Sequence, residues 1–177
     1  MRRVSGALAA ALVLSGLLAL TGGCARHRDI TGTWQLDRKR SSDTDPWRKI
    51  ELKIERDGST LTLHKRWAAS RYSQERVLVF TTGGDTSAVE LPAPKWPDTP
   101  HLGVWVKPGT VDKIVASWEK PGRSLRTVER YPLQTSQGEI ALEVHKNYRV
   151  SEDGKTLTVT EERSTRPNGF TFVYVRK

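Results

Sequence analysis

Cysteine is almost absent from this sequence, because Cys24 is the only one in 177 residues. No disulfide can therefore form within one chain, even in an oxidising compartment. After residue 30 the sequence has no apolar stripe at helical spacing and no block of five basic residues. These absences favour a β-rich domain with an ordinary solvated surface.

The motifs of common enzyme and metal sites are also missing. The sequence has no G-x-S-x-G or H-E-x-x-H motif and no glycine-rich phosphate loop. None of its histidines has the spacing of a metal ligand. The histidines are His27, His64, His101 and His145. We therefore expect a protein without catalytic activity, metal or cofactor, although a triad built from distant positions leaves no local signature.

The N-terminal segment has the layout of an export signal. Arg2 and Arg3 are followed by the apolar run 8–20, the small residues 21–23 and Cys24. A cysteine directly after such a stretch resembles the lipobox of bacterial lipoproteins. The resemblance implies that residues 1–23 are removed as a signal peptide. It also implies that Cys24 carries acyl chains such as palmitate, which anchor the protein in a lipid bilayer.

Residues 24–29 are the expected lipidated tether. In the lipoprotein family, a residue such as Ala25 after the cysteine implies the outer membrane facing the periplasm of a Gram-negative cell. Thr21 departs from the family pattern, in which leucine usually holds that place. Two alternatives stay open: a signal peptide cut near Gly23 that leaves a free thiol, or a spanning helix over residues 4–23.

The charge is moderately positive. The chain has 29 basic and 20 acidic residues, and removal of residues 1–23 leaves a net charge of +7. A basic exported domain suits anionic lipid head groups or envelope polymers, whereas nucleic acid is not an expected partner outside the cytoplasm. The even spread of arginine and glutamate also fits a solvated β-surface.

From residue 30 onward the sequence is a series of short β-rich runs broken by glycine, proline and aspartate. The expected strands are Gly32–Asp37, Lys49–Arg56, Thr60–Trp67, Gln74–Thr81, Ser87–Leu91, Gly103–Lys107, Lys113–Glu119, Leu125–Tyr131, Ile140–Val150, Thr156–Arg163 and Phe170–Arg176. The prolines of the loop Pro92–Pro100 exclude a central strand there, so we expect a rim or a lid. Residues 30–177 are thus predicted to form one all-β domain.

Two Asp-Gly dipeptides predict hairpins with type I′ turns, in which both central residues have positive φ. With Asp57-Gly58 at the tip, the expected pairs are Ile54 with Leu61, Leu52 with Leu63 and Ile50 with Lys65. With Asp153-Gly154 at the tip, they are Val150 with Leu157, Tyr148 with Val159 and Lys146 with Glu161. In both hairpins the apolar residues share one face, which a slip of one residue would destroy.

The first expected strand opens with Gly32-Thr33-Trp34, and the last hairpin contains DGKTLTVT. This pattern resembles the lipocalin-like (calycin-type) barrels, in particular exported bacterial ones. The resemblance implies an antiparallel up-and-down β-barrel of about eight to ten strands. It also implies a barrel floor formed by Gly32, Trp34 and Arg176. The Thr-Asp-Tyr loop and C-terminal helix of lipocalins are missing, and a β-sandwich or an open curved sheet is the competing architecture.

Aromatic and charged residues are the candidates for a ligand site. Aromatic linings suit apolar or sugar-like ligands, although core packing is the alternative for each tryptophan. The candidate tryptophans are Trp67, Trp96, Trp105 and Trp118. By register, Lys65, Lys146 and Glu161 face the interior, either as a polar anchor for a ligand or at the wet end of the barrel.

These observations predict a membrane-anchored envelope protein that binds a small apolar or amphipathic ligand in a β-barrel, without catalysis. The alternative is a filled barrel that acts as a structural or interaction module through its basic outer surface. No protein partner is predicted from the sequence.

Overall fold

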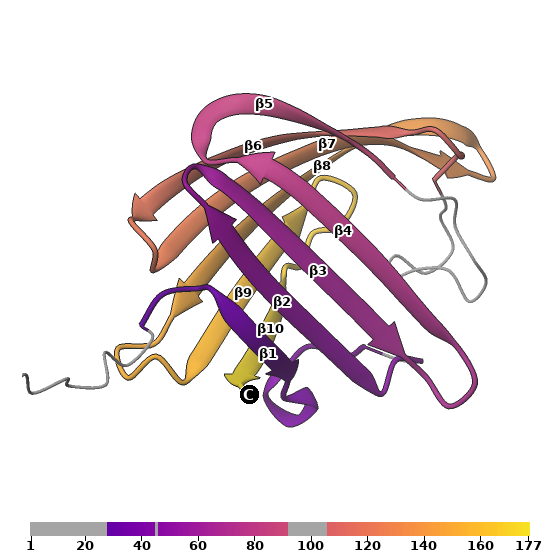
Figure 1. Ribbon diagram of the computed structural model, residues 1–177. Coiled ribbons are helices and arrows are strands. Elements are labelled where there is room, and N and C mark those ends of the chain that lie inside the picture. The colour runs from indigo at the N-terminus through magenta and orange to yellow at the C-terminus, as the bar shows by residue number, and fades with distance from the viewer. Residues whose placement is uncertain (1–27, 45, 92–105) are drawn as a thin grey trace, which may run out of the picture.

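The computed structural model describes residues 28–44, 46–91 and 106–177, which form ten β-strands and one 3-10 turn (Figure 1). The elements are β1 (Gly32–Leu36), η1 (Arg38–Arg40), β2 (Lys49–Asp57), β3 (Thr60–Ala68), β4 (Ser73–Thr81), β5 (Gly83–Glu90), β6 (Val111–Lys120), β7 (Ser124–Thr135), β8 (Gly138–Val150), β9 (Thr156–Arg163) and β10 (Phe170–Arg176). Within these ranges, no helix is long and apolar enough to cross a membrane.

All ten strands belong to one antiparallel sheet with the order β4-β3-β2-β1-β10-β9-β8-β7-β6-β5. Every pair of neighbours except β1 and β10 is also consecutive in sequence, so the sheet is an up-and-down meander. It rolls into a nearly closed barrel, with β2–β4 in front of β7–β10 in Figure 1. The predicted lipocalin-like barrel of about eight to ten strands is confirmed.

The barrel closes between β4 and β5, which are the two ends of the strand order. Among the described strands no backbone ladder joins this pair, and side chains bridge the seam instead. Thr81 N of β4 donates a hydrogen bond to Ser87 Oγ of β5 at 3.0 Å, and Arg76 Nη2 of β4 donates to Asp112 Oδ2 of β6 at 2.9 Å. The barrel is therefore closed at this seam by side-chain contacts and by the direct chain connection through Thr82.

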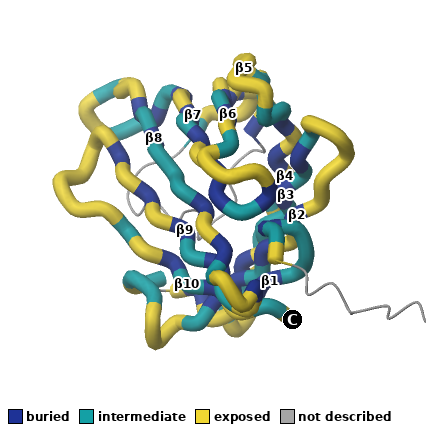
Figure 2. The backbone as a smooth tube through the Cα atoms, turned by 90° about the vertical axis from the view of Figure 1, so that its left-hand side faces the viewer, coloured by how far each residue is buried: buried dark blue, intermediate teal, exposed yellow. Residues whose placement is uncertain are grey.

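Burial alternates along the strands, as Figure 2 shows by colour. In β2, for example, Ile50, Leu52 and Ile54 are buried while the residues between them are not. Successive side chains of a strand point to opposite faces, so one face of every strand lines the interior. The buried side chains of both walls form one continuous apolar core.

The predicted register of the β8–β9 hairpin is confirmed, because Val150 pairs with Leu157 and Lys146 with Glu161. The predicted turn type is wrong. Gly154 has a φ of 74°, and no described residue other than glycine has a positive φ. A type I′ turn at Asp153-Gly154 is therefore excluded.

The predicted register of the β2–β3 hairpin is wrong by two residues. Gly58 and Ser59 form the tip, so Ile54 pairs with Leu63 and not with Leu61. Of these two tip residues only Gly58, with φ 57°, has a positive φ, which fits a type II′ turn with glycine in first place. A shift of two residues preserves the alternation, so the predicted inner face is unchanged.

Several predicted features lie outside the described residues. These are the signal segment 1–23, Cys24, most of the tether and the loop Pro92–Pro100. The expected strand Gly103–Lys107 lies there in part, and its described residues 106 and 107 are not in a strand.

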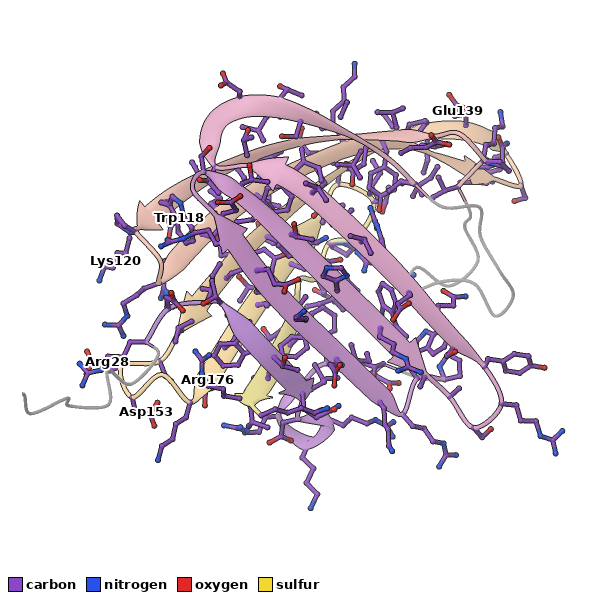
Figure 3. The ribbon with its side chains drawn as sticks, viewed as in Figure 1. Arg28, Trp118, Lys120, Glu139, Asp153 and Arg176 are labelled. Atoms are coloured by element: carbon purple, nitrogen blue, oxygen red, sulfur yellow. The ribbon has the colours of Figure 1, made fainter. Side chains whose placement is uncertain are left out.

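Arg176 lies at one end of the barrel (Figure 3), where its guanidinium group stacks on the ring of Trp34. The guanidinium carbon lies 4.0 Å from the centre of the indole ring. The guanidinium also donates hydrogen bonds of 2.7 Å to the backbone carbonyls of Asp29, Thr31 and Gly154. These contacts join the chain before β1 to the β8–β9 turn and hold the Arg176 side chain in place.

Gly32 is the third residue predicted for the barrel floor, and it needs to be glycine for two reasons. Its φ of +118° is unfavourable for other residues, and a Cβ atom would lie 2.6 Å from Arg176 Nη1. Because Arg176 is held by three carbonyls, it cannot move aside without loss of hydrogen bonds.

We expect Gly32→Ala to lower the free energy of unfolding more than Gly138→Ala does, measured by urea denaturation. Gly138 has nearly the same φ, +117°, but a Cβ atom added there would meet no other atom within 4 Å. The Gly138→Ala variant therefore measures the cost of the backbone strain without a steric clash. That strain costs about 1–3 kcal/mol. Disruption of the Arg176 contacts should add about 1–3 kcal/mol at position 32. Equal losses in the two variants would mean that Arg176 adjusts freely.

Candidate functional site

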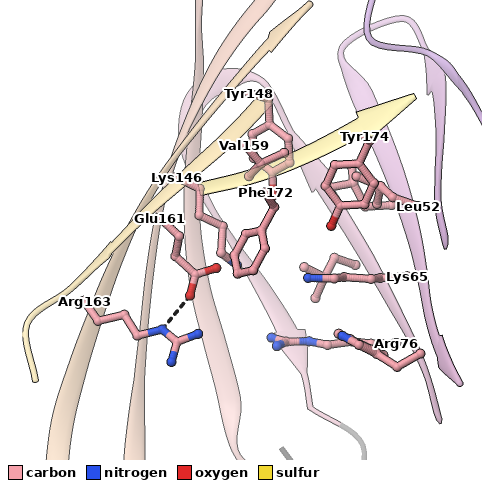
Figure 4. A pocket seen from close by; sticks show the side chains of 13 residues that line it. Leu52, Lys65, Arg76, Lys146, Tyr148, Val159, Glu161, Arg163, Phe172 and Tyr174 are labelled. Carbon is pink, nitrogen blue, oxygen red and sulfur yellow. Dashed lines mark hydrogen bonds and ion pairs between the residues drawn. The ribbon is translucent and has the colours of Figure 1, made fainter. Parts of the chain in front are cut away.

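A cavity of about 60 Å³ lies inside the barrel, between the β3–β4 wall and the strands β8–β10 (Figure 4). Its lining combines aliphatic, aromatic and charged side chains from six strands. The lining residues are Leu52, Leu63, Lys65, Trp67, Arg76, Leu78, Lys146, Tyr148, Val159, Glu161, Arg163, Phe172 and Tyr174. These side chains meet because each occupies an inward position in the alternating pattern of its strand.

The aromatic part of the lining comes from three strands. Trp67 lies on β3, Tyr148 on β8, and Phe172 and Tyr174 on β10. Burial raises the pKa of Tyr148 and Tyr174, so both phenols keep their protons. They bring neutral hydroxyl groups to the aromatic part of the lining.

Two ion pairs occupy the β8–β9 side of the cavity. Lys146 Nζ lies 2.6 and 2.7 Å from the two carboxylate oxygens of Glu129. Arg163 Nε donates to Glu161 Oε1 at 2.5 Å, the contact drawn in Figure 4. Burial lowers the pKa of Lys146, but the adjacent Glu129 outweighs that effect and raises it above its ordinary value. Lys146 therefore stays charged, and each of the two cations has a carboxylate partner.

A third ion pair joins Arg76 to Asp112, whose side chain is fully buried. Burial, together with repulsion from nearby Glu129, raises the pKa of Asp112 to about 7, although Arg76 opposes the shift. Within the described part of the chain, Arg76 Nε and Asp112 Oδ1 have no hydrogen-bond partner. The pair thus leaves one donor of Arg76 unused.

Lys65 differs from the other three cations of the lining. Among the described residues, its ammonium group contacts two aromatic rings and no carboxylate. Nζ lies 5.0 Å from the centre of the Trp67 ring and 5.5 Å from that of Phe172. Such cation–π contacts stabilise a desolvated ammonium group only in part.

The surroundings of Lys65 disfavour its charged form. Burial lowers the pKa of Lys65 to about 8, and the positive charges of Lys146 and Arg76 act in the same direction. Glu161 and Glu129 oppose the shift without cancelling it. Within the described residues, Lys65 is therefore a charged group at neutral pH that lacks a counter-ion.

The structure brings together three of the candidate residues from the sequence. Trp67, Lys146 and Glu161 all line the cavity. Lys146 and Glu161 are cross-strand neighbours, but their ion-pair partners are Glu129 and Arg163 instead of each other.

The other tryptophan candidates lie elsewhere. Trp118 is outside the cavity lining, with the guanidinium carbon of Arg56 6.0 Å from its ring centre. Trp96 and Trp105 lie outside the described residues. In the part of the chain that the structure covers, no three histidine, cysteine or acidic residues are grouped as a metal site.

Sequence reasoning missed four charged residues of the site. They are Arg76, Asp112, Glu129 and Arg163. Each belongs to the inward-facing series of its strand, as Arg76 does two residues before Leu78 and four before Phe80. A charged residue at an inward-facing position could have indicated a buried ion pair, because a charge on the buried face of a strand rarely lacks a partner.

Replacement of Lys65 by methionine should raise the free energy of unfolding at pH 7 by about 1–3 kcal/mol, because a desolvated charge is removed. The pKa of Lys65 is lowered, so the native state binds fewer protons than the unfolded state between about pH 8 and 10.5. The stability of the wild type then rises with pH in this window, and the advantage of Lys65→Met shrinks.

Denaturation at several pH values measures this effect. Lys53→Met, on the outer face of β2 with its side chain 49% exposed, is the matched control and should show little change. A loss of stability in Lys65→Met that is independent of pH would show that the aromatic contacts of Lys65 dominate.

The sequence matches no family model and no curated protein. Several solved structures share its fold. Human cRBP IV has 12% identity and a TM-score of 0.52, over 84% of this chain and 98% of that chain. Caenorhabditis elegans lipid binding protein 8 has 10% identity and a TM-score of 0.51, over 83% and 94%. The REP1-NXSQ fatty acid transporter has 11% identity and a TM-score of 0.50, over 83% and 95%. At these identities the likeness shows the fold alone, a calycin-type β-barrel.

Proposed function

We propose that this protein is a non-catalytic binder of a small amphipathic molecule, which it holds in the barrel cavity. The observation that carries the proposal is the composition of the lining, which combines aromatic rings with charged groups from both walls of the cavity. Buried charges stabilise a core less than apolar side chains of similar size. Their presence around a cavity is better explained by a ligand with a polar end than by packing.

The barrels of similar fold support this proposal, since their names describe a fatty acid transporter and a lipid binding protein. The volume of about 60 Å³ limits the occupant. Ligand pockets for drug-sized molecules are commonly about 300–1,000 Å³. The cavity therefore suits a small molecule, or the polar end of a longer one.

The second candidate function is the filled barrel that acts through its basic outer surface. The small cavity favours it, because a barrel of this size is either filled by side chains or holds one small ligand. The two candidates differ in whether the purified protein retains a small molecule.

Native mass spectrometry of the protein, purified from a bacterial envelope without denaturant, tests the proposed function. We expect an additional mass of a few hundred daltons or less that is lost on unfolding. A bare polypeptide mass, with tryptophan fluorescence unchanged by fatty acids, lipids and apolar dyes, would favour the filled barrel.

We also propose that the protein is exported and anchored through acylated Cys24, in the outer membrane if the cell is Gram-negative. The layout of residues 1–24 supports this, as does the start of the barrel domain close to Cys24. Ile30 is fully buried, and its backbone N donates to Gly122 O at 2.7 Å. A tether over residues 24–29 spans at most about 20 Å, so the barrel would lie near the membrane surface.

Replacement of Cys24 by serine should abolish lipidation and release the protein from membranes. The measurement is the intact mass of the protein in the membrane and soluble fractions of an expressing bacterium. The wild type is expected to start at Cys24 and to carry acyl chains, and Ala25→Ser, the adjacent control, should keep them. A soluble wild-type protein with a free thiol, or one that retains residues 4–23, would contradict the proposal.

A further inference from the structure

Lys65 and Arg76 are directly opposite each other in the β3–β4 ladder, and both side chains line the cavity. Figure 4 shows the two side chains one above the other on this wall, facing Glu161 and Arg163 across the space. Like charges at directly opposite positions of a ladder repel each other. The repulsion is stronger in a partly desolvated interior than at a solvated surface.

The charges around the cavity do not balance. Three of the four cations have a carboxylate partner within 2.9 Å, and Lys65 has none among the described residues. Arg76, moreover, has a buried Nε without a partner in the same part of the chain. The unmet requirement of the site is therefore one negative charge that accepts hydrogen bonds, next to the β3–β4 wall.

We propose that Lys65 and Arg76 form an anion subsite, which holds the head group of an amphiphile with a single negative charge. Lys65 Nζ and Arg76 Nε donate to its oxygens. The apolar part of the ligand lies against the aromatic lining, to which Trp67 and Phe172 belong. This inference rests on the proposed function, because it names the chemical class of the ligand that the cavity holds.

The neighbouring acidic groups explain why one negative charge is favoured over two. Glu161 and Glu129 both act electrostatically on Lys65, as the direction of their effects on its pKa shows. A second charge on the ligand would meet their repulsion without a further unpaired cation, among the described lining residues, to receive it. The site also disfavours cationic amphiphiles, since Lys65 and Arg76 would repel them.

Calorimetric titration of three eight-carbon probes tests the subsite: octanoate, neutral octanamide and cationic octylamine. The protein is expressed with residues 1–177, so that any processing of its N-terminal segment takes place. At pH 7 we expect octanoate to bind at least tenfold more tightly than octanamide, and octylamine to bind most weakly. Lys65→Met should abolish the preference for octanoate while octanamide binds as before.

Two further variants make the test specific. Lys65→Arg keeps the charge and should retain the preference for octanoate, also if Lys65→Met does not fold. Lys53→Met removes a lysine from the outer face of the adjacent strand and should bind octanoate like the wild type. A general loss of positive charge would affect Lys53→Met and Lys65→Met equally, which would overturn the proposal.

The two proposals fail in different ways. Equal binding of octanoate and octanamide to the wild type, or an unchanged preference in Lys65→Met, would overturn the anion subsite and leave the ligand-binding function standing. Absence of binding of all three probes, together with a bare mass in native mass spectrometry, would overturn both.

Discussion

The pairing of β1 with β10 is the contact on which the barrel depends. It is the one ladder among the described strands that joins segments far apart in sequence, since all other neighbours are consecutive. The loop that it closes spans nearly the whole domain, so its entropic cost is the largest in the sheet. Arg176 stabilises this junction from β10, by stacking on Trp34 of β1 and binding three backbone carbonyls.

The opposite seam is held in another way. Between β4 and β5 no ladder of described residues exists, and Arg76 reaches across it to Asp112 of β6. The same arginine lines the cavity. Closure of the barrel and the electrostatics of the proposed anion subsite therefore share a residue. This sharing explains why a charged pair occupies a position that an apolar contact would otherwise fill.

Much of the fold was predictable from local pattern. Alternation of apolar and polar residues indicated the strands, and the register of the β8–β9 hairpin follows from its sequence. The predicted register of the β2–β3 hairpin was wrong by two residues because the turn residues are Gly58 and Ser59. Of these two, only the glycine has a positive φ. An Asp-Gly dipeptide indicates a turn but does not decide which of two overlapping tips forms.

For the candidate site, the sequence alone determined which side chains face the interior. Trp67, Lys146 and Glu161 followed from strand period, which is a local property of the chain. Only the tertiary structure decided the partners of the charged groups. Glu129 contacts Lys146 diagonally across the β7–β8 ladder. Asp112 contacts Arg76 across the β4–β5 seam, where the described residues form no ladder. Such contacts depend on the curvature of the closed sheet, which no single strand encodes, and among the described residues they leave Lys65 without a counter-ion.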